Sequence, residues 1–250
     1  MRQETSALGI CFEGLVIVSF INVIYTFSNK LYTFLDSYYV IIPSLVIKGV
    51  EYIVKRSNKE ETPEIIKTKL STIHATLLFV SNVLFLYNYL SLNLWMNVLL
   101  YSVIYNGMDM VYLYYSDMKI KKELLFHHFM LITCITPILV NFDIKLPTNY
   151  YRVVAINFLC EITTIPLNLA WILYAKNNHN TFNFKALSGL TILLYIPFRI
   201  CLTTYLSYKV LEWESALKYF QFMLTTLNYY WFYKMVQKVV KITKKNNKIK

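Results

Sequence analysis

Residues 151–175 read YRVVAINFLCEITTIPLNLAWILYA, and this stretch decides the fold class of the chain. An α-helix needs about 20 mainly apolar residues to cross the hydrocarbon core of a bilayer. Between Arg152 and Lys176 the only charged side chain is Glu161. The stretch is therefore predicted to be a membrane-spanning helix that carries one acidic side chain into the membrane.

The composition of the whole chain agrees with this interpretation. Its 250 residues are 56% hydrophobic and only 16% charged, whereas about 25% of residues are charged in an average soluble domain. The 22 tyrosines suit an interface where the ring lies in hydrocarbon and the hydroxyl reaches the headgroups. The predicted fold class is all-α, a polytopic helical membrane protein.

Eight segments are long and apolar enough to be candidate spans: 8–27, 33–53, 71–90, 95–115, 124–140, 151–175, 186–208 and 217–236. The second is the weakest, because Asp36, Pro43 and Lys48 interrupt it. We therefore expect about seven to eight transmembrane helices. The chain divides into an N-terminal lead with one or two spans and a charged linker (1–60), a main membrane domain (61–241) and a basic cytoplasmic tail (242–250).

The basic residues predict an orientation. A net charge of +11 would suggest a nucleic-acid partner for a soluble protein, but here the lysines lie in short loops and the tail, next to apolar spans. They are better explained by orientation in the membrane and attraction to anionic lipids, with no nucleic acid as a partner. With eight spans they gather on the side that holds the loops 54–70, 116–123 and 176–185, which predicts that both termini are cytoplasmic.

Polar residues recur inside three spans at the spacing of one helix face. The three stripes are Ser102, Asn106 and Asp109; Asn157, Glu161, Thr164 and Asn168; and Gln221, Thr225 and Asn228. Ionisable groups in hydrocarbon are costly and tend to face a bundle interior or a cavity. The stripes therefore predict an inward-facing polar lining, although Asn and Thr can also simply hold neighbouring helices together.

Depth in the membrane groups the candidate site residues into two layers. At 1.5 Å per residue, six of them lie roughly 5–12 Å from the cytoplasmic end of their spans: His74, Asp109, His127, His128, Asn168 and Asn228. Glu161 and Arg199 lie deeper, each roughly 20 Å in. Because an unpaired charge there would cost more than a paired one, we expect Glu161 and Arg199 to form an ion pair with a structural role.

The adjacent pair His127 and His128 is the sharpest functional signal. Neighbouring residues point about 100° apart on a helix, so both can line one cavity, whereas joint binding of one metal ion is awkward. The four cysteines show no CxxC pairing, so neither a metal site nor a disulfide framework is expected. His74, one turn into its helix, is equally well explained as a residue that bonds at headgroup level.

The stretch from Lys69 to about Lys241 resembles the TLC domain, which is shared by ceramide synthases and other membrane proteins. Six motifs follow in the order of that family: STIHA at 71–75, GMD at 107–109, the His127–His128 pair, EITTIPLNLAW at 161–171, PFRI at 197–200 and LNYYW at 227–231. The tyrosine of the family's Gly-Tyr element is absent from the second. This resemblance implies a six-helix domain that encloses a cavity for long-chain lipid, usually in the endoplasmic reticulum.

In ceramide synthases the histidine pair and a downstream aspartate pair support acyl transfer. This chain has only Glu161, followed by Thr and Pro, where the second element would stand, and so it resembles the non-synthase branch more closely. The resemblance implies binding or handling of a membrane lipid, without a cofactor and without an established reaction. A homo-oligomer is left open.

Two alternatives remain. In the first, the protein is an acyl-CoA-dependent N-acyltransferase of the ceramide synthase type, with acyl-CoA as co-substrate only. His127 or His128 would then act as general base or acyl acceptor, Asp109 would fix the imidazole, and Asn168 or Asn228 would polarise the carbonyl. In the second, suggested by the resemblance alone, it acts in endoplasmic reticulum trafficking or in regulating lipid composition.

Overall fold

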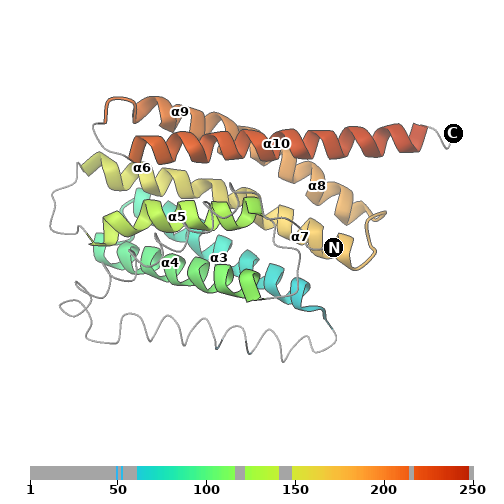
Figure 1. The fold of residues 1–250 in the computed structure, drawn as a ribbon, viewed down its shortest axis with the longest axis horizontal. Helices are drawn as coiled ribbons and strands as arrows, with labels where there is room; N and C mark the ends of the chain where they lie inside the picture. The colour runs from blue at the N-terminus through green and yellow to red at the C-terminus, as the bar shows by residue number, and fades with distance from the viewer. Residues whose placement is uncertain are drawn as a thin grey trace, which may run out of the picture. The chain divides into compact units, whose positions relative to one another are not determined.

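The computed structural model describes residues 49, 52, 61–115, 122–140, 148–213 and 217–247. Within these ranges the chain consists of helices and short turns, with no strand (Figure 1). The predicted all-α fold class is confirmed. Span 8–27 and nearly all of span 33–53 lie outside the described residues.

Eight α-helices and two helical segments of other types follow one another in the described ranges. The α-helices are α3 (Pro63–Leu86), α4 (Leu92–Tyr115), α5 (Lys122–Val140), α6 (Thr148–Phe158), α7 (Thr164–Ala175), α8 (Phe182–Tyr195), α9 (Leu202–Lys209) and α10 (Leu217–Asn247). A 3₁₀ helix, η1 (Leu159–Thr163), joins α6 to α7, and a π-helix, η2 (Ile196–Cys201), joins α8 to α9.

The structure supports membrane insertion. Three described helical stretches are long and apolar enough to cross a bilayer, Pro63–Leu86, Asn149–Ala175 and Phe182–Lys209, and Glu123–Ile135 is a shorter apolar helix. They correspond to the predicted spans 71–90, 151–175, 186–208 and 124–140. The total of seven to eight spans stays a prediction.

Helix α3 begins earlier than the predicted span, which started at Ser71. Thr62 has an extended backbone and Pro63 occupies the first helical turn, where its fixed φ suits a helix and its missing N–H costs nothing. The polar turns around Lys67 and Lys69, predicted as part of a linker, are therefore helical. A helix can continue beyond the hydrocarbon core of the bilayer. Hydropathy therefore predicts where the span lies but not where the helix begins or ends.

The chain forms two compact units. Unit 1 comprises Met1–Gly49 and Met96–Lys145, and unit 2 comprises Val50–Trp95 and Leu146–Lys250. In unit 2, α3 packs against α6, η1 and α7, while α7 also packs against α8, and α9 and η2 pack against α10. Among the described residues, unit 1 contains most of α4 and all of α5.

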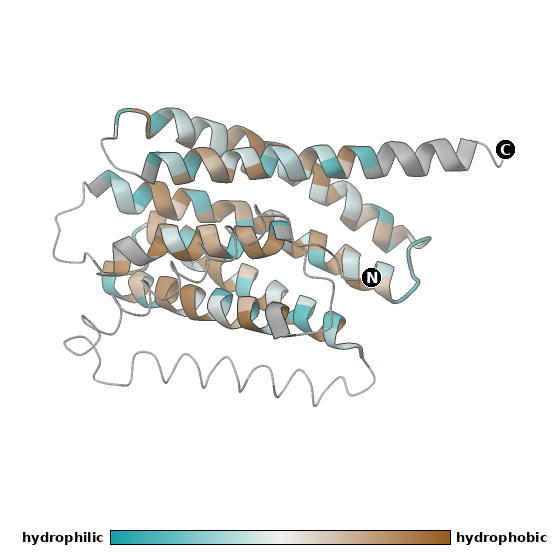
Figure 2. Cartoon of the chain, viewed as in Figure 1, coloured by the Kyte–Doolittle hydropathy of each residue, from teal (hydrophilic) through white to brown (hydrophobic). Residues whose placement is uncertain are grey.

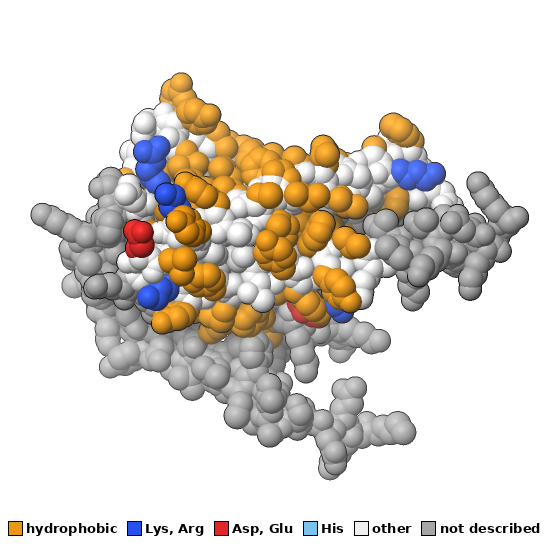
Figure 3. Space-filling model, turned by 90° about the horizontal axis from the view of Figure 1, so that it is seen from above, with side chains coloured by type: hydrophobic (Ala, Val, Ile, Leu, Met, Phe, Trp, Pro, Cys, Tyr) orange, Lys and Arg blue, Asp and Glu red, His pale blue; other side chains and the backbone are white. Residues whose placement is uncertain are grey.

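The exposed faces of unit 2 are apolar, as expected for contact with lipid tails. On α3, Ile73, Leu77, Val80 and Leu84 are exposed and share one face of the helix, whereas Ala75 and Leu78 on the other face are about 1% exposed. Figure 2 shows apolar colouring along most of the helices. Figure 3 shows a face covered mainly by hydrophobic side chains, with few charged ones among them.

Two prolines explain why η1 and η2 are not α-helical. A proline has no N–H to donate, and its ring clashes with the carbonyl four residues earlier. Pro166 therefore prevents a regular α-helix from running past Ile162, and the chain tightens into η1 just before it. Pro197 lies inside η2, where the helix widens instead. Because η1 packs against η2, two irregular segments meet deep in unit 2.

Candidate functional site

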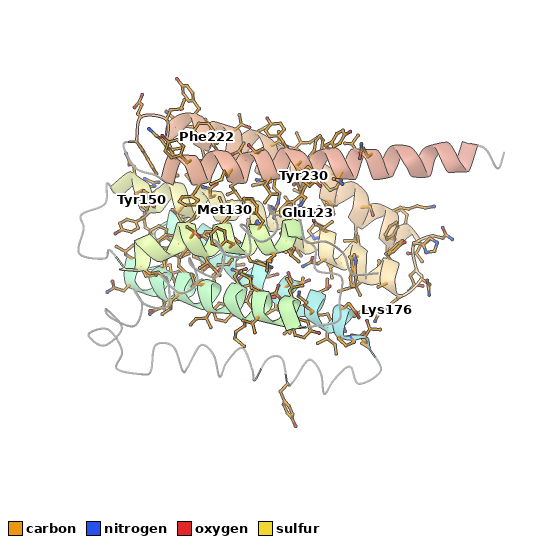
Figure 4. All side chains as sticks on the ribbon, in the orientation of Figure 1. Glu123, Met130, Tyr150, Lys176, Phe222 and Tyr230 are labelled. Carbon is orange, nitrogen blue, oxygen red and sulfur yellow. The ribbon has the colours of Figure 1, made fainter. Side chains whose placement is uncertain are left out.

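In unit 1, His128 is held between two side chains of α4. Its Nδ1 lies 2.6 Å from Oδ1 of Asn106, and its Nε2 lies 2.9 Å from Oδ2 of Asp109. Asn106 is 1% and His128 8% exposed. The two α4 residues are three positions apart, so one face of α4 presents both to α5. Figure 4 labels Glu123 and Met130 on α5, which bracket the histidine pair in sequence.

The proton positions in this cluster follow from a chain of hydrogen bonds. Asn106 Nδ2 donates to the carbonyl oxygen of Ser102 at 2.8 Å. A carbonyl can only accept, so Oδ1 of Asn106 must be the atom that faces His128, and Nδ1 of His128 must donate to it. Nδ1 of His128 is thus engaged as a donor, whereas its Nε2 lies 2.9 Å from Oδ2 of Asp109 without the alignment of a hydrogen bond.

The imidazole ring of His127 lies beside that of His128 but has a different orientation. The two imidazole rings have centroids 5.7 Å apart and are tilted by 50°. His127 is as buried as its neighbour. The turn of about 100° between adjacent helical residues accounts for the divergence.

In unit 2, Arg199 is the centre of a second buried cluster. Its Nε donates to Thr163 Oγ1 at 2.6 Å, Nη2 to Thr164 Oγ1 at 2.8 Å, and Nη1 to Asn228 Oδ1 at 3.2 Å. The guanidinium carbon lies 5.7 Å from the ring centroid of Tyr195 and 6.0 Å from that of Trp231. The charged head is thus solvated by hydroxyl and amide oxygens and by aromatic faces.

Glu161 lies beside this cluster. Its Oε1 is 3.8 Å from Nη2 of Arg199, a distance that fits an ion pair but is too long for a hydrogen bond. The side chains predicted to pair are therefore neighbours, but the hydrogen bonds of Arg199 go to neutral oxygens. Thr163 and Thr164 lie at the junction of η1 and α7, and their hydroxyls accept from different nitrogens of the guanidinium.

Asn228 is fully buried, and its contact with Arg199 determines which atom of the side-chain amide is the oxygen. Arginine can only donate, so Oδ1 of Asn228 must face Nη1, and Nδ2 must point elsewhere. Among the described residues no acceptor lies within hydrogen-bond distance of Nδ2. The backbone carbonyl of Asn228 accepts from the hydroxyl of Tyr195 at 3.1 Å.

Asn168 and His74 lie at the contact between α3 and α7. Asn168 Nδ2 donates to Oγ of Ser71 at 3.2 Å, which is the kind of interhelical bond expected of a residue that holds helices together. His74, one turn further along α3, is buried. Of the residues predicted to line one layer, His128 and Asp109 meet in unit 1, and Asn228 meets Arg199 in unit 2.

Two residues outside the predicted site set take part in the clusters. Asn106 belonged to the polar stripe of its span, and that stripe was the signal for it. Thr163 gave no signal, because a regular helix would place it about 100° from its neighbour Thr164, which is in the stripe. Arg199 reaches both hydroxyls because its guanidinium presents Nε to Thr163 and Nη2 to Thr164.

A third polar cluster lies at the beginning of the stretch Pro63–Leu86, with Glu61 and Lys176 outside the membrane-spanning stretches. The carboxylate of Glu61, two residues before α3, lies 2.5 Å from Nζ of Lys176 and 2.6 Å from Nζ of Lys69. Hydrogen bonds from Lys176 and then Lys69 hold the pKa of Glu61 below its ordinary value of 4.5. The ion pairs of this cluster join the beginning of α3 to the end of α7. Lys176, at the end of α7, is labelled in Figure 4.

Apolar spanning helices with charged groups buried inside them define an integral membrane protein of the helical class. The TLC domain matches residues 60–237 of the sequence. The chain therefore belongs to the TLC-domain family. Its sequence has no significant match among curated proteins.

Proposed function

We propose that the protein binds a membrane lipid in a polar-lined intramembrane cavity, without catalysing a reaction on it. One observation carries this proposal: polar side chains occupy the buried faces of helices whose exposed faces are apolar. On α10, Asn228 is 0% and its neighbour Tyr229 47% exposed. Membership of the TLC-domain family adds support, because it associates the chain with membrane lipids. The candidate binding residues are Asp109, His127 and His128 in unit 1, and His74, Asn168 and Asn228 in unit 2.

The competing explanation is that these side chains only hold the helices together. It fits Asn168, whose amide bonds to Ser71. It fits Arg199 and Asn228 less well, because a buried charge and an amide with an unfilled donor destabilise a purely structural contact. The presence of Arg199 and Asn228 in the buried interior is better explained by a bound ligand.

Acyl transfer from acyl-CoA is the alternative function, and the contact between His128 and Asp109 favours it. A histidine fixed by a carboxylate is common in acid–base catalysis. Because Nδ1 of His128 donates to Asn106, its Nε2, the nitrogen that faces Asp109, would be the one to act as base or acyl acceptor. If the protein is an N-acyltransferase, His127 or His128 would be the reacting group.

The decisive experiment compares bound lipid and CoA release in purified protein. We expect lipid to be retained after size-exclusion chromatography, and acyl-CoA with a sphingoid base to yield no CoA. The variant His127→Ala/His128→Ala should retain less lipid. His179→Ala is the matched control, because His179 is exposed. CoA release that the double variant abolishes would establish the alternative, and absence of any retained lipid would refute lipid binding.

We also propose that the protein resides in a membrane of the endoplasmic reticulum type, with both termini cytoplasmic. The asymmetry of the basic residues supports the orientation. A role in trafficking has no observation among the described residues in its favour.

A further inference from the structure

The cluster around Arg199 has more hydrogen-bond donors than it can satisfy. A guanidinium has five N–H groups, and three are donated to Thr163, Thr164 and Asn228. The described residues provide Arg199 with these three acceptors, and Nδ2 of Asn228 is buried with no acceptor among them. Buried donors without acceptors are rare and call for a partner.

The same cluster has an acceptor without a donor. No described residue donates a hydrogen bond to the carboxylate of Glu161, and the Nη2 of Arg199 stays 3.8 Å away. An oxygen atom about 2.8 Å from both Nη2 of Arg199 and the carboxylate of Glu161 would bridge the two groups. Such an atom must accept from Arg199 and also carry a proton for Glu161.

The charge of the cluster limits the ligand further. Arg199 and Glu161 carry opposite charges, and the other hydrogen-bonding groups are neutral hydroxyls and an amide. A phosphate or a carboxylate would add an uncompensated negative charge in a low-dielectric region. A bare ester carbonyl could accept from Arg199 but would leave Glu161 unsatisfied.

A hydroxyl group meets all these conditions, because it donates one hydrogen bond and accepts two. We propose that Glu161, Arg199 and Asn228 form a binding site for a hydroxyl oxygen, supplied by the uncharged alcohol headgroup of a membrane lipid. Nδ2 of Asn228 is the further donor to that oxygen or its neighbour. This inference rests on the proposed function and names the chemistry of its ligand. A trapped water molecule offers the same chemistry, and the experiment distinguishes the two sources.

The test uses the full chain in nanodiscs of dioleoylphosphatidylcholine, whose headgroup has no hydroxyl. A photoactivatable diacylglycerol is crosslinked to the protein and mapped by peptide mass spectrometry. Unlabelled dioleoylglycerol and its 3-deoxy analogue, in which hydrogen replaces the hydroxyl, then compete for the site. Because the two competitors differ only in that group, the comparison needs no mutation.

We expect crosslinks to peptides that contain η1, η2 or the Asn228 region of α10. Dioleoylglycerol should compete about tenfold more strongly than the deoxy analogue, as expected for hydrogen bonds to charged groups. In Glu161→Gln the advantage should disappear, and oleate should compete better than in the wild type, since Arg199 is then uncompensated. Thr191→Val is the control, because buried Thr191 bonds only to the Leu187 carbonyl of its own helix; it should behave as the wild type.

Equal competition by the two analogues in the wild type would mean that water fills the site, and it would overturn this inference while leaving lipid binding intact. A tenfold advantage that survives in Glu161→Gln would also overturn it, because the hydroxyl would then be recognised elsewhere. Absence of specific crosslinking would also overturn this inference, and lipid retained after size-exclusion chromatography would then show that the proposed function still stands.

Discussion

The buried charge of Arg199 is stabilised by neutral hydrogen-bonding groups as much as by its charged neighbour Glu161. Arg199 bonds to two hydroxyls and an amide, and Glu161 lies 3.8 Å away without a direct hydrogen bond. Burial makes such a pair costly to break, because removing one partner leaves the other charge uncompensated. Removing both partners is tolerated far better.

This asymmetry predicts the outcome of a double-mutant cycle. Arg199→Met should destabilise the protein by about 3–5 kcal/mol, measured as thermal unfolding in detergent. Arg199→Met/Glu161→Leu should recover at least half of that loss, since no charge is then left without a partner. Equal destabilisation by the single and double variants would show that the two side chains do not interact.

The contact between His128 and Asp109 gives a second prediction. In Asp109→Asn, the new amide can donate to Nε2, so His128 should become a neutral imidazole with its proton on Nδ1. Nitrogen-15 NMR of histidine-labelled protein should show the signals of that single tautomer, with the exposed His179 as internal control. An unchanged His128 spectrum would contradict the contact with Asp109.

At the scale of elements, the irregular segments η1 and η2 position the charged cluster, and an ion-pair cluster joins α3 to α7. The latter involves Glu61, Lys69 and Lys176, of which Glu61 and Lys176 lie outside the spanning stretches. The pKa of Glu61 is lower in the folded protein than in the unfolded chain. Its stabilising effect is therefore present above the unfolded pKa of about 4.5 and is lost as the pH falls through the lower folded value.

We expect the wild type to lose stability between pH 6 and pH 3 relative to Glu61→Gln, which cannot titrate at this position. The measurement is the thermal midpoint of both proteins across that range. The difference in thermal midpoint between the two proteins should shrink in high salt, since the cluster is partly exposed and salt screens its charges effectively. Parallel pH profiles of the two proteins would show that the cluster contributes nothing to stability.

At the scale of the whole molecule, the basic residues predict a single orientation in the membrane. The turn between α3 and α4, which contains Asn88 with φ of 61°, should face the non-cytoplasmic side. A glycosylation acceptor inserted at this turn should be modified in microsomes. The same acceptor fused to either end of the chain should not be modified, and the opposite pattern would reverse the orientation.

The sequence was a good guide to the helical class and to the faces of helices, and a poor guide to irregular segments. Ser102 and Asn106, predicted to share a face, are hydrogen-bonded on that face. Thr163 could not be predicted, because it lies one residue off the polar stripe that contains Thr164, yet its hydroxyl also reaches Arg199. The end of span 217–236 also differs: α10 continues to Asn247, since polar residues outside hydrocarbon can extend a helix that hydropathy alone would end.

The unbroken course of α10 has a practical consequence. Its 31 residues correspond to about 46 Å of helix, while the hydrocarbon core of a bilayer is about 30 Å thick. If residues 217–236 cross the bilayer as predicted, the final turns project into water as a stalk. At 29.6 kDa the protein is small for single-particle electron microscopy, and a soluble fiducial domain joined in helical register to this stalk would give each particle a feature by which to align it.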